Sequence, residues 1–305
     1  MIKREAYKQR NYGLSTQNEP GEDTYLTTNV RLYPDMYYAY KKFGELFNLQ
    51  PDTFFLGNGC ENTMKNVLLA LKPKTLCWAG PTWRMLEVYC EALDIKPIYK
   101  QFIYNKTDNS FETPTDFYNT KADVLYSNCG ITTCFEYNCL IKDLNESAAK
   151  YNICDITYQN IDCMKQSIEI LLKNPKNIIV GSFDKLIGCG LRLGFVIYPK
   201  SLHHKMSLQR EQYINSLAFS WLMDTDFDID KPKYKEELIQ MTSSIDYVTD
   251  NFITIYGDVI STMPCHKFIV DNHTFTRFGM PNNQTEFEAL KLIITDFIHD
   301  RLYNK

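Results

Sequence analysis

A lysine and an arginine lie seven residues apart in the segment GSFDKLIGCGLRLGF (181–195). Lys185 directly follows an apolar stretch typical of a strand, and Arg192 lies within the glycine-flanked sequence GLRLG. A lysine amine that is withdrawn from water can have its pKa lowered and then act as an imine-forming nucleophile. The alternative is a solvated surface role, which is the fate of most lysines.

Two further segments place polar residues at the ends of predicted strands. GNGCEN (57–62) is a glycine-rich turn before a helix, where backbone N–H groups can approach a phosphate. It lacks the full spacing of a dinucleotide-binding or P-loop motif, so a purely structural turn is the alternative. Asp155 ends the apolar segment of NICDITY, and Tyr158 follows three residues later. A buried carboxylate requires a partner, unless Asp155 serves as a helix N-cap or turn residue.

Together these segments resemble the fold-type I pyridoxal phosphate enzymes, and most closely the histidinol-phosphate aminotransferase branch. The resemblance runs from about Tyr33 to Phe195, with a fainter similarity at the C-terminus. It rests on LYPD before an amphipathic helix, FFLGNGCENTMKNVLLAL, GPTW, DITY and SFDKLIGCGLRLGF. The order of these segments is that of the family, as is the interval of 30 residues between Asp155 and Lys185.

The resemblance implies that pyridoxal phosphate is held as a Schiff base on Lys185, which also moves protons. It implies that Asp155 keeps the pyridine nitrogen protonated. Tyr158 and Asn128 would donate hydrogen bonds to the 3′-oxygen of the ring, and Trp83 would stack on the ring. These residues therefore form the expected centre of a catalytic site.

The phosphate-binding groups implied by the resemblance are Ser182, Arg192 and the backbone of Gly59, Cys60 and Glu61. Tyr33 corresponds to a tyrosine that reaches the phosphate of the partner subunit, which implies a homodimer with shared active sites. Arg277, in HTFTRFGMPNN, corresponds to an arginine that binds the substrate's α-carboxylate. The alternatives are an ordinary salt bridge for Arg192 and a surface position for Arg277.

The chain also departs from the family pattern. SNCGITT (127–133) replaces the Pro-Asn-Asn-Pro-Thr-Gly segment, so Asn128 is chosen partly for its distance of 27 residues from Asp155. Asp184 stands where many relatives have serine, and its charge would weaken phosphate binding unless the side chain points away. The turn between the lysine and the arginine is one residue short, the segment before YPD is shortened, and the glycine after Arg277 comes early.

The resemblance favours an aminotransferase for an amino acid or an amino-acid phosphate, with a small-molecule amino donor and acceptor. The same branch includes decarboxylases of phosphorylated amino acids, so a decarboxylase or lyase is the first alternative. A non-catalytic binding protein on a decayed scaffold is the second, motivated by Asp184, the altered loop and the shortened arm. The retention of Lys185, Asp155, Tyr158 and Arg192 together speaks against decay.

Helical and strand-like segments alternate from about residue 36 onward. Apolar strands are predicted at 53–57, 75–80, 96–104, 122–127, 152–158, 177–183 and 191–198. Helices are predicted at 36–49, 61–72, 84–93 and 163–173, with a helical patch near 137–150. Short apolar strands separated by helices predict an α/β fold, with a mostly parallel sheet sandwiched by helices. This fold is also the one that the resemblance implies.

The composition changes after about residue 225, where DTDFDIDKPKYKEE is acidic and polar. We predict an N-terminal arm that is part of the small domain (1–32), a large cofactor-binding domain (33–224) and a small C-terminal domain (225–305). The small domain is expected to be α+β, with a helix at 235–257, a strand around KFIVD and a terminal helix at 284–303.

The bulk composition argues against several other classes. The chain has 305 residues, of which 44% are hydrophobic, and its formal net charge of −4 indicates neither a nucleic-acid nor a membrane partner. It contains neither the roughly 20 apolar residues that span a bilayer nor an N-terminal signal sequence. The ten cysteines include no C-x-x-C pair and suggest neither a metal site nor a disulfide framework. We therefore expect a cytoplasmic enzyme with reduced thiols.

Overall fold

The computed structural model describes residues 36–132, 134–137, 139, 141–187, 190–211, 213–227, 232–242, 247–261 and 263–303. The chain divides into two compact units, unit 1 (Met1–Pro73 and Ile153–Asp228) and unit 2 (Lys74–Asn152 and Ile229–Lys305). The predicted division into arm, large domain and small domain follows other boundaries and stays a prediction. The predicted arm and Tyr33 lie outside the described residues.

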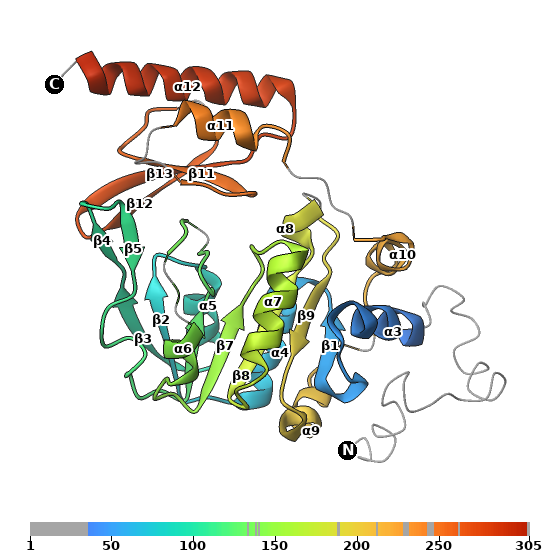
Figure 1. Cartoon of the computed structure of the whole chain (residues 1–305). Helices are drawn as coiled ribbons and strands as arrows, with labels where there is room; N and C mark the ends of the chain where they lie inside the picture. The colour runs from blue at the N-terminus through green and yellow to red at the C-terminus, as the bar shows by residue number, and fades with distance from the viewer. Residues whose placement is uncertain are drawn as a thin grey trace. The chain divides into compact units, whose positions relative to one another are not determined.

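A seven-stranded, mostly parallel sheet carries the α/β fold that the sequence predicts (Figure 1). Its strands, in spatial order, are β1 (Phe54–Gly57), β9 (Gly194–Ile197), β8 (Asn177–Ser182), β7 (Tyr151–Asp155), β6 (Val124–Ser127), β2 (Thr75–Gly80) and β3 (Lys96–Gln101). Strand β2 is parallel to β3 and β6, whereas β9 is antiparallel to β1 and β8. Strands β1, β6, β8 and β9 are buried along their whole length, which explains their continuous apolar sequences.

Unit 1 surrounds its strands with helices, of which α3 contributes aromatic side chains to the core. The helices are α3 (Met36–Phe47), η1 (Pro51–Thr53), α4 (Gly59–Leu71), α7 (Ile161–Leu171), α8 (Asp184–Ile187), η2 (Lys200–Leu202), α9 (His203–Ser207) and α10 (Ser216–Asp224). The Phe43 ring of α3 packs against Phe54 at 5.0 Å and against Phe195 at 5.1 Å between centroids. All three rings are buried, so α3 seals one edge of the unit 1 core.

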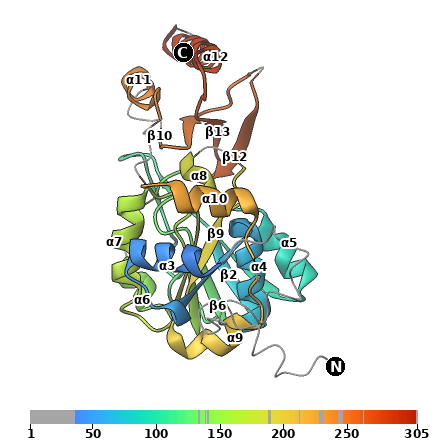
Figure 2. The same ribbon diagram turned by 90° about the vertical axis from the view of Figure 1, so that its right-hand side faces the viewer.

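Helices α3 and α10 lie side by side in unit 1 (Figure 2). The Lys42 amine on α3 donates hydrogen bonds to the carbonyl oxygens of Met223 and Thr225, at 2.7 and 2.6 Å. A lysine at this position satisfies carbonyl groups at the C-terminal end of a helix and opposes the negative end of the helix dipole. This contact fixes the end of α10 on α3.

Unit 2 contains the remaining elements. In its first segment these are α5 (Met85–Ala92), α6 (Ile141–Asn145) and the antiparallel hairpin of β4 (Ile103–Asn105) and β5 (Ser110–Glu112). In its second segment they are α11 (Lys235–Met241), β10 (Tyr247–Val248), β11 (Phe252–Tyr256), β12 (Cys265–Val270), β13 (His273–Gly279) and α12 (Gln284–Tyr303). The four strands of the second segment form an antiparallel sheet in the order β10-β11-β13-β12.

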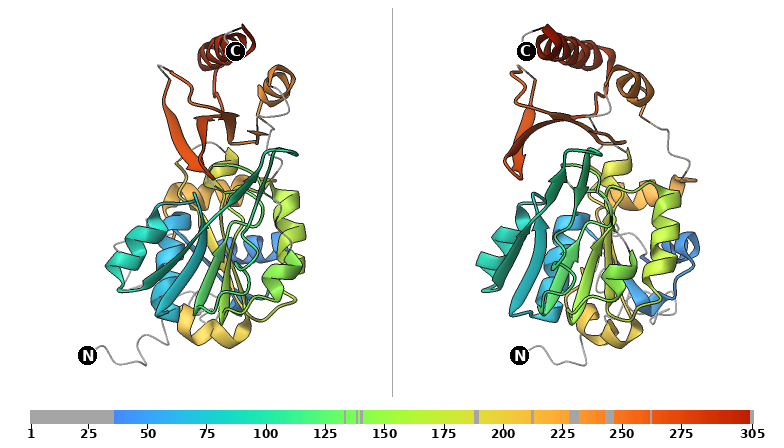
Figure 3. Two further views of the ribbon diagram at one scale, coloured as in Figure 1. Left: turned by 90° about the vertical axis from the view of Figure 1, so that its left-hand side faces the viewer. Right: turned by 60° about the vertical axis from the view of Figure 1, so that its left-hand side comes forward.

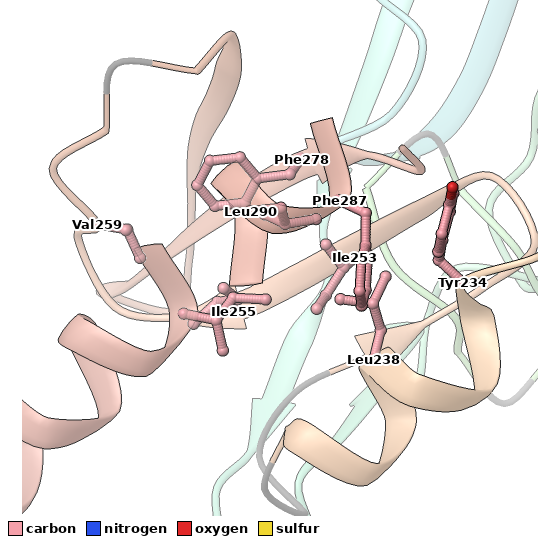
Figure 4. Packing of buried hydrophobic residues seen from close by; sticks show 9 residues of the cluster. Tyr234, Leu238, Ile253, Ile255, Val259, Phe278, Phe287 and Leu290 are labelled. Carbon is pink, nitrogen blue, oxygen red and sulfur yellow. The ribbon is translucent and has the colours of Figure 1, made fainter. Parts of the chain in front are cut away.

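Helices α11 and α12 cover one face of this antiparallel sheet (Figure 3). The buried cluster between them consists of Tyr234, Leu238, Ile253, Ile255, Val259, Phe278, Phe287, Leu290 and Ile294 (Figure 4). The rings of Tyr234 and Phe287 stack at 4.6 Å between centroids and 11° between planes. The predicted α+β character of the C-terminal segment therefore rests on a core of its own.

The predicted helix at 235–257 is wrong beyond Met241. Residues 247–256 instead form β10, a turn and β11, and β11 pairs with both β10 and β13. The hydroxyl of Thr249 accepts a hydrogen bond from the Asn251 N–H at 3.1 Å and stabilises the turn. FITIY is rich in aromatic and β-branched residues, and pairing on both edges outweighs its helical periodicity.

Among the described residues, no helix has the length and apolar character needed to cross a membrane. The nine described cysteines are free thiols. No group of three or more His, Cys, Asp or Glu side chains in the described part of the chain is arranged to hold a metal ion.

Candidate active site

The turn between β1 and α4 brings a glycine against an arginine. Gly59, the first residue of α4, has a φ of +87°, a left-handed conformation that favours glycine. A Cβ atom at this position would lie 3.0 Å from Cζ and 3.1 Å from Nε of Arg192. The absence of a side chain therefore lets the guanidinium group lie against the first turn of α4.

The start of β9 packs equally closely on this turn. A Cβ atom on Gly194 would lie 2.4 Å from the carbonyl carbon of Gly59 and 2.7 Å from the nitrogen of Cys60. Nη2 of Arg192 lies 3.5 Å from Oε2 of Glu61, and both side chains are about half exposed. A helix N-terminus and a guanidinium group together make a cradle for a phosphate group.

Lys185 lies on the short helix α8, directly after β8 and Phe183. Its side chain is exposed, and Nζ lies 5.8 Å from the centroid of the Tyr158 ring. Tyr158 follows the end of β7 by three residues, so two strand ends of unit 1 bring the amine and the phenol ring together. The amine is thus accessible to a carbonyl compound, but it is not withdrawn from water as the sequence suggested.

Asp155 is the last residue of β7 and is only 6% exposed. Its Oδ1 accepts a hydrogen bond from the Thr157 N–H at 2.9 Å. The Thr157 hydroxyl donates in turn to the sulfur of Cys60 at 3.3 Å. Burial raises the pKa of the Cys60 thiol well above its ordinary value, and the nearby carboxylates of Asp155 and Asp184 raise it further. The end of β7 and the phosphate-type turn are therefore in direct contact.

The side chains of Ser182 and Asp184 bind the backbone at the start of β9. The Ser182 hydroxyl donates to the Leu193 carbonyl and accepts from the Asp184 N–H, both at 3.1 Å. Oδ1 of Asp184 accepts a hydrogen bond from the Leu193 N–H at 3.1 Å. The Asp184 carboxylate is thus satisfied by the backbone, and the one hydroxyl proton of Ser182 is already donated to a carbonyl.

In unit 2, Asn128 and the loop that carries Trp83 are bound to each other. Oδ1 of Asn128 accepts a hydrogen bond from the Thr82 hydroxyl at 2.5 Å, and its Nδ2 donates to the Tyr126 hydroxyl at 2.9 Å. Asn128 is 5% exposed. The Trp83 ring is half-buried and lies edge-to-face with Tyr89, at 5.9 Å between centroids. Two side-chain hydrogen bonds therefore fix the position and the orientation of the Asn128 amide.

Arg277 lies on β13, opposite Thr254 of β11 and His266 of β12. Its Cζ lies 4.7 Å from the centroid of the Phe252 ring, within the range of a cation–π contact. Nε is buried and has no hydrogen-bond partner among the described residues. A guanidinium group that is backed by an aromatic ring and has an unused N–H is suited to bind a carboxylate.

The predicted site residues thus fall into two groups. Unit 1 holds Gly59, Cys60, Glu61, Asp155, Tyr158, Ser182, Lys185 and Arg192, and unit 2 holds Trp83, Asn128 and Arg277. Tyr33 lies outside the described residues.

Comparisons with known proteins give matches among solved structures. No family model matches the chain, and no curated protein matches it. The histidinol-phosphate aminotransferase from Clostridium acetobutylicum matches with a TM-score of 0.70 and 14% identity, over 90% of this chain and 92% of that chain. The chain has the fold of that enzyme. The fold that the resemblance implies is therefore confirmed over nearly the whole length.

Two other matches carry further information in their names. The histidinol-phosphate aminotransferase from Sinorhizobium meliloti, in complex with pyridoxal-5′-phosphate, matches with a TM-score of 0.65 and 12% identity, over 89% of this chain and 85% of that chain. The L-threonine-O-3-phosphate decarboxylase from Porphyromonas gingivalis matches with a TM-score of 0.65 and 11% identity, over 97% of this chain and 96% of that chain. Both aminotransferases and decarboxylases therefore share this fold.

Sequence reasoning missed four residues that contact the candidate site, namely Asn58, Thr157, Glu211 and Asn215. Asn215 directly precedes the apolar helix α10, which is an N-cap signal, and its Oδ1 accepts from the Ala218 N–H at 2.9 Å. Thr157 lies two residues after Asp155, a local clue to a turn. Glu211 has no local signal, because its partner Asn58 is 153 residues away.

Proposed function

We propose that the chain is a pyridoxal phosphate-dependent aminotransferase that acts on an amino acid or an amino-acid phosphate. The observation that carries the proposal is the grouping of three features within unit 1. These are an exposed lysine amine on Lys185, a buried carboxylate on Asp155, and an α4 N-terminus backed by Arg192. The fold shared with histidinol-phosphate aminotransferases supports it.

The residues of unit 1 fit the groups of this cofactor. The N–H groups of the first turn of α4 and the Arg192 guanidinium would hold the phosphate, in a cradle that a Cβ on Gly59 would fill. Asp155 would hold the proton of the pyridine nitrogen, and Lys185 would bind the aldehyde carbon. Ser182 would donate to the phosphate only after releasing the Leu193 carbonyl.

Pyridoxal phosphate, when bound, withdraws electrons from the carbon that carries the substrate's amino group, so that bonds to this carbon break more easily. The Lys185 amine would take the proton from this α-carbon and return a proton during the transfer. Asp155, as a buried anion, favours the protonated form of the pyridine nitrogen over the neutral form. Tyr158, whose ring lies beside Nζ of Lys185, would orient the amine.

Three residues of unit 2 are assigned by the family resemblance. Asn128 would bind the 3′-oxygen of the ring together with Tyr158, and Trp83 would stack on the ring. Arg277 would bind the substrate's α-carboxylate, which its buried Nε and the Phe252 ring behind it support.

The test is a covalent adduct at a defined lysine. The protein incubated with pyridoxal phosphate should turn yellow and lose the colour on reduction with borohydride, and peptide mapping should place the reduced adduct on Lys185. Lys185→Ala should fold, lose the adduct and lose turnover, whereas the control Lys173→Ala, on an exposed lysine, should keep all three properties. An adduct spread over several surface lysines would contradict the proposal.

A decarboxylase is the second candidate, because the match to the L-threonine-O-3-phosphate decarboxylase structure covers 97% of this chain and 96% of that chain. The two activities differ in what they need and release. A transaminase requires a keto acid to return the aminated cofactor to the aldehyde, whereas a decarboxylase releases carbon dioxide without an acceptor. Mass-balance measurements with and without keto acid separate the two.

We further propose that the protein acts as a cytoplasmic homodimer, as the resemblance at Tyr33 implies. Mixing Tyr33→Phe chains with Lys185→Ala chains should produce a heterodimer in which one shared site is free of both lesions. Activity that rises on mixing would support shared sites, whereas a monodisperse, active monomer would contradict them.

A further inference from the structure

The residue at the N-cap of α4 does not cap its own helix. Asn58 has φ −83° and ψ 71°, and its side chain makes no capping hydrogen bond. Asparagine is favoured at this position because its side-chain oxygen usually accepts from an N–H group of the first turn. Here Oδ1 accepts instead from the backbone N–H of Asn215 at 2.9 Å and from its Nδ2 at 3.4 Å. The N–H groups of the first turn are thus not covered by Asn58.

Glu211 holds Asn58 in this conformation. Oε2 of Glu211 accepts two hydrogen bonds, from the Asn58 backbone N–H at 2.8 Å and from Asn58 Nδ2 at 2.5 Å. Nδ2 also donates to the carbonyl oxygen of Tyr213 at 3.3 Å. Both ends of the Asn58 amide are therefore bound, by Glu211, Tyr213 and Asn215, which prevents Oδ1 from turning toward the helix.

Asn215 extends the same support to Arg192. Its Nδ2 donates to the carbonyl oxygen of Leu191 at 3.0 Å and lies 3.5 Å from the carbonyl oxygen of Arg192. Its Oδ1 caps α10 by accepting from the Ala218 N–H. One asparagine therefore connects the turn before α4, the segment that carries the arginine, and the start of α10.

We infer that Glu211 and Asn215 are positioning residues for the phosphate subsite. They keep the Asn58 side chain off the first turn of α4, so that its N–H groups and Arg192 are available to a phosphate group. The inference rests on the proposed function, since the phosphate is that of the proposed cofactor. Neither residue would contact the phosphate itself. Glu211 acts through Asn58, and Asn215 acts through Asn58 and the backbone carbonyls of Leu191 and Arg192.

The charge and the hydrogen bonds of Glu211 act in opposite directions. A carboxylate near the start of α4 repels a phosphate dianion, so loss of the charge alone would strengthen phosphate binding. Loss of the acceptor would free Asn58 to cap α4 and compete with the phosphate for its N–H groups. Glu211→Gln removes the charge and keeps an acceptor, whereas Glu211→Ala removes both.

Binding of three probes would be measured by titration: pyridoxal phosphate, pyridoxal without the phosphate, and inorganic phosphate. Glu211→Ala should raise the dissociation constants of pyridoxal phosphate and inorganic phosphate about fivefold, the scale of one N-cap hydrogen bond, and leave that of pyridoxal unchanged. Glu211→Gln should not raise them. The control Glu45→Ala removes an exposed carboxylate of α3 and should change none.

A double variant supplies a readout that a merely structural role would not give. Asn58→Ala removes the competing cap, so Glu211→Ala/Asn58→Ala should bind pyridoxal phosphate more tightly than Glu211→Ala alone. If Glu211→Ala does not fold, Glu211→Asp takes its place, since it keeps the charge but draws the acceptor back from Asn58.

Four results would overturn the inference. The first is that Glu211→Ala binds the phosphate probes as tightly as Glu211→Gln does, and the second is that Glu211→Ala weakens the binding of pyridoxal as much as that of pyridoxal phosphate. The third is that the double variant binds pyridoxal phosphate no more tightly than Glu211→Ala. The fourth is that the parent protein binds neither pyridoxal phosphate nor inorganic phosphate. If the parent and the Glu211 variants bind inorganic phosphate as expected but the parent forms no adduct at Lys185, the proposed function is contradicted and this inference still stands.

Discussion

The Thr157 hydroxyl donates a hydrogen bond to the sulfur of Cys60 at 3.3 Å, and this contact joins the end of β7 to the first turn of α4. Cys60 stands within the phosphate-type turn, and Thr157 binds Asp155 through its N–H. Asp155 and the α4 turn, which are expected to contact opposite ends of the cofactor, are therefore connected through Thr157 within unit 1.

The state of the Cys60 thiol gives a first prediction. Burial, assisted by the Asp155 carboxylate, raises its pKa, so the thiol remains protonated at neutral and mildly alkaline pH. Iodoacetamide reacts with the thiolate, so at pH 8 it should modify the exposed Cys163 and Cys265 and leave Cys60 intact. Mass spectrometry of peptides would measure this, with urea-unfolded protein as the control in which Cys60 also reacts. Rapid modification of Cys60 in the folded protein would contradict it.

Two aspartates near the site should respond differently to neutralisation. Asp155→Asn should lower the turnover rate by orders of magnitude with a smaller loss of cofactor affinity, because an amide cannot hold the proton on the pyridine nitrogen. Asp184→Asn keeps an acceptor for the Leu193 N–H and removes an anion, so it should bind pyridoxal phosphate at least as tightly as the parent. Steady-state rates and cofactor titrations on both variants test this, and equal losses would mean that neither role is correct.

Substitutions of Arg192 and Ser182 should have different effects on cofactor affinity and on stability. Arg192→Ala should weaken the binding of pyridoxal phosphate by about 1.5–3 kcal/mol, which is typical of a hydrogen bond to a charged group. The binding of pyridoxal, which lacks the phosphate, should not change. Ser182→Ala should lower the free energy of unfolding by about 1 kcal/mol, since its hydroxyl bonds the Leu193 carbonyl. Its effect on cofactor affinity should be smaller than that of Arg192→Ala. The reverse ranking in cofactor titrations would show that Ser182 is the main phosphate donor.

The parallel-sheet fold was predictable because its strands are short, continuous apolar segments separated by helices. The failure at β11 has a physical cause, since FITIY becomes a strand through pairing with the adjacent β10 on one edge and with β13, about 20 residues later in the sequence, on the other. For the site, motifs located the turn, Asp155 and Lys185, because each lies at the end of a strand or shortly after it. No motif could show that the Asp184 carboxylate bonds the Leu193 N–H, or that Glu211 bonds Asn58, because these contacts depend on tertiary structure.

Two glycines, Gly190 before β9 and Gly194 at its start, provide a matched test of the close packing behind the cradle. A Cβ on Gly194 would lie 2.4 Å from a backbone carbon of Gly59, whereas a Cβ on Gly190 would meet nothing within 4 Å. Gly194→Ala should therefore lower the free energy of unfolding by about 1–3 kcal/mol or more, as overpacking does. It should also weaken the binding of pyridoxal phosphate. Gly190→Ala should leave both unchanged in urea unfolding and cofactor titration. Equal stability of the two variants would mean that β9 and α4 are packed less closely than the distances around Gly194 indicate.

Arg277 is the residue that we propose determines which kind of substrate the protein binds. Its guanidinium lies over the Phe252 ring, and its buried Nε lacks a hydrogen-bond partner among the described residues, so a bidentate carboxylate would satisfy it. Arg277→Lys keeps the charge but loses the planar fork, and should weaken binding of α-amino acids by about 1.5–3 kcal/mol.

The matched control for Arg277→Lys is the ligand rather than a second variant. An amine that differs from the amino acid only by the missing carboxylate should bind the parent and the variant almost equally, because Arg277 makes no contact with it. Dissociation constants for both ligands on both proteins give a double cycle whose coupling term measures the carboxylate contact. Equal losses for the two ligands would assign Arg277 a structural role on β13. No loss for either would show that the carboxylate is bound elsewhere or that the substrate is an amine.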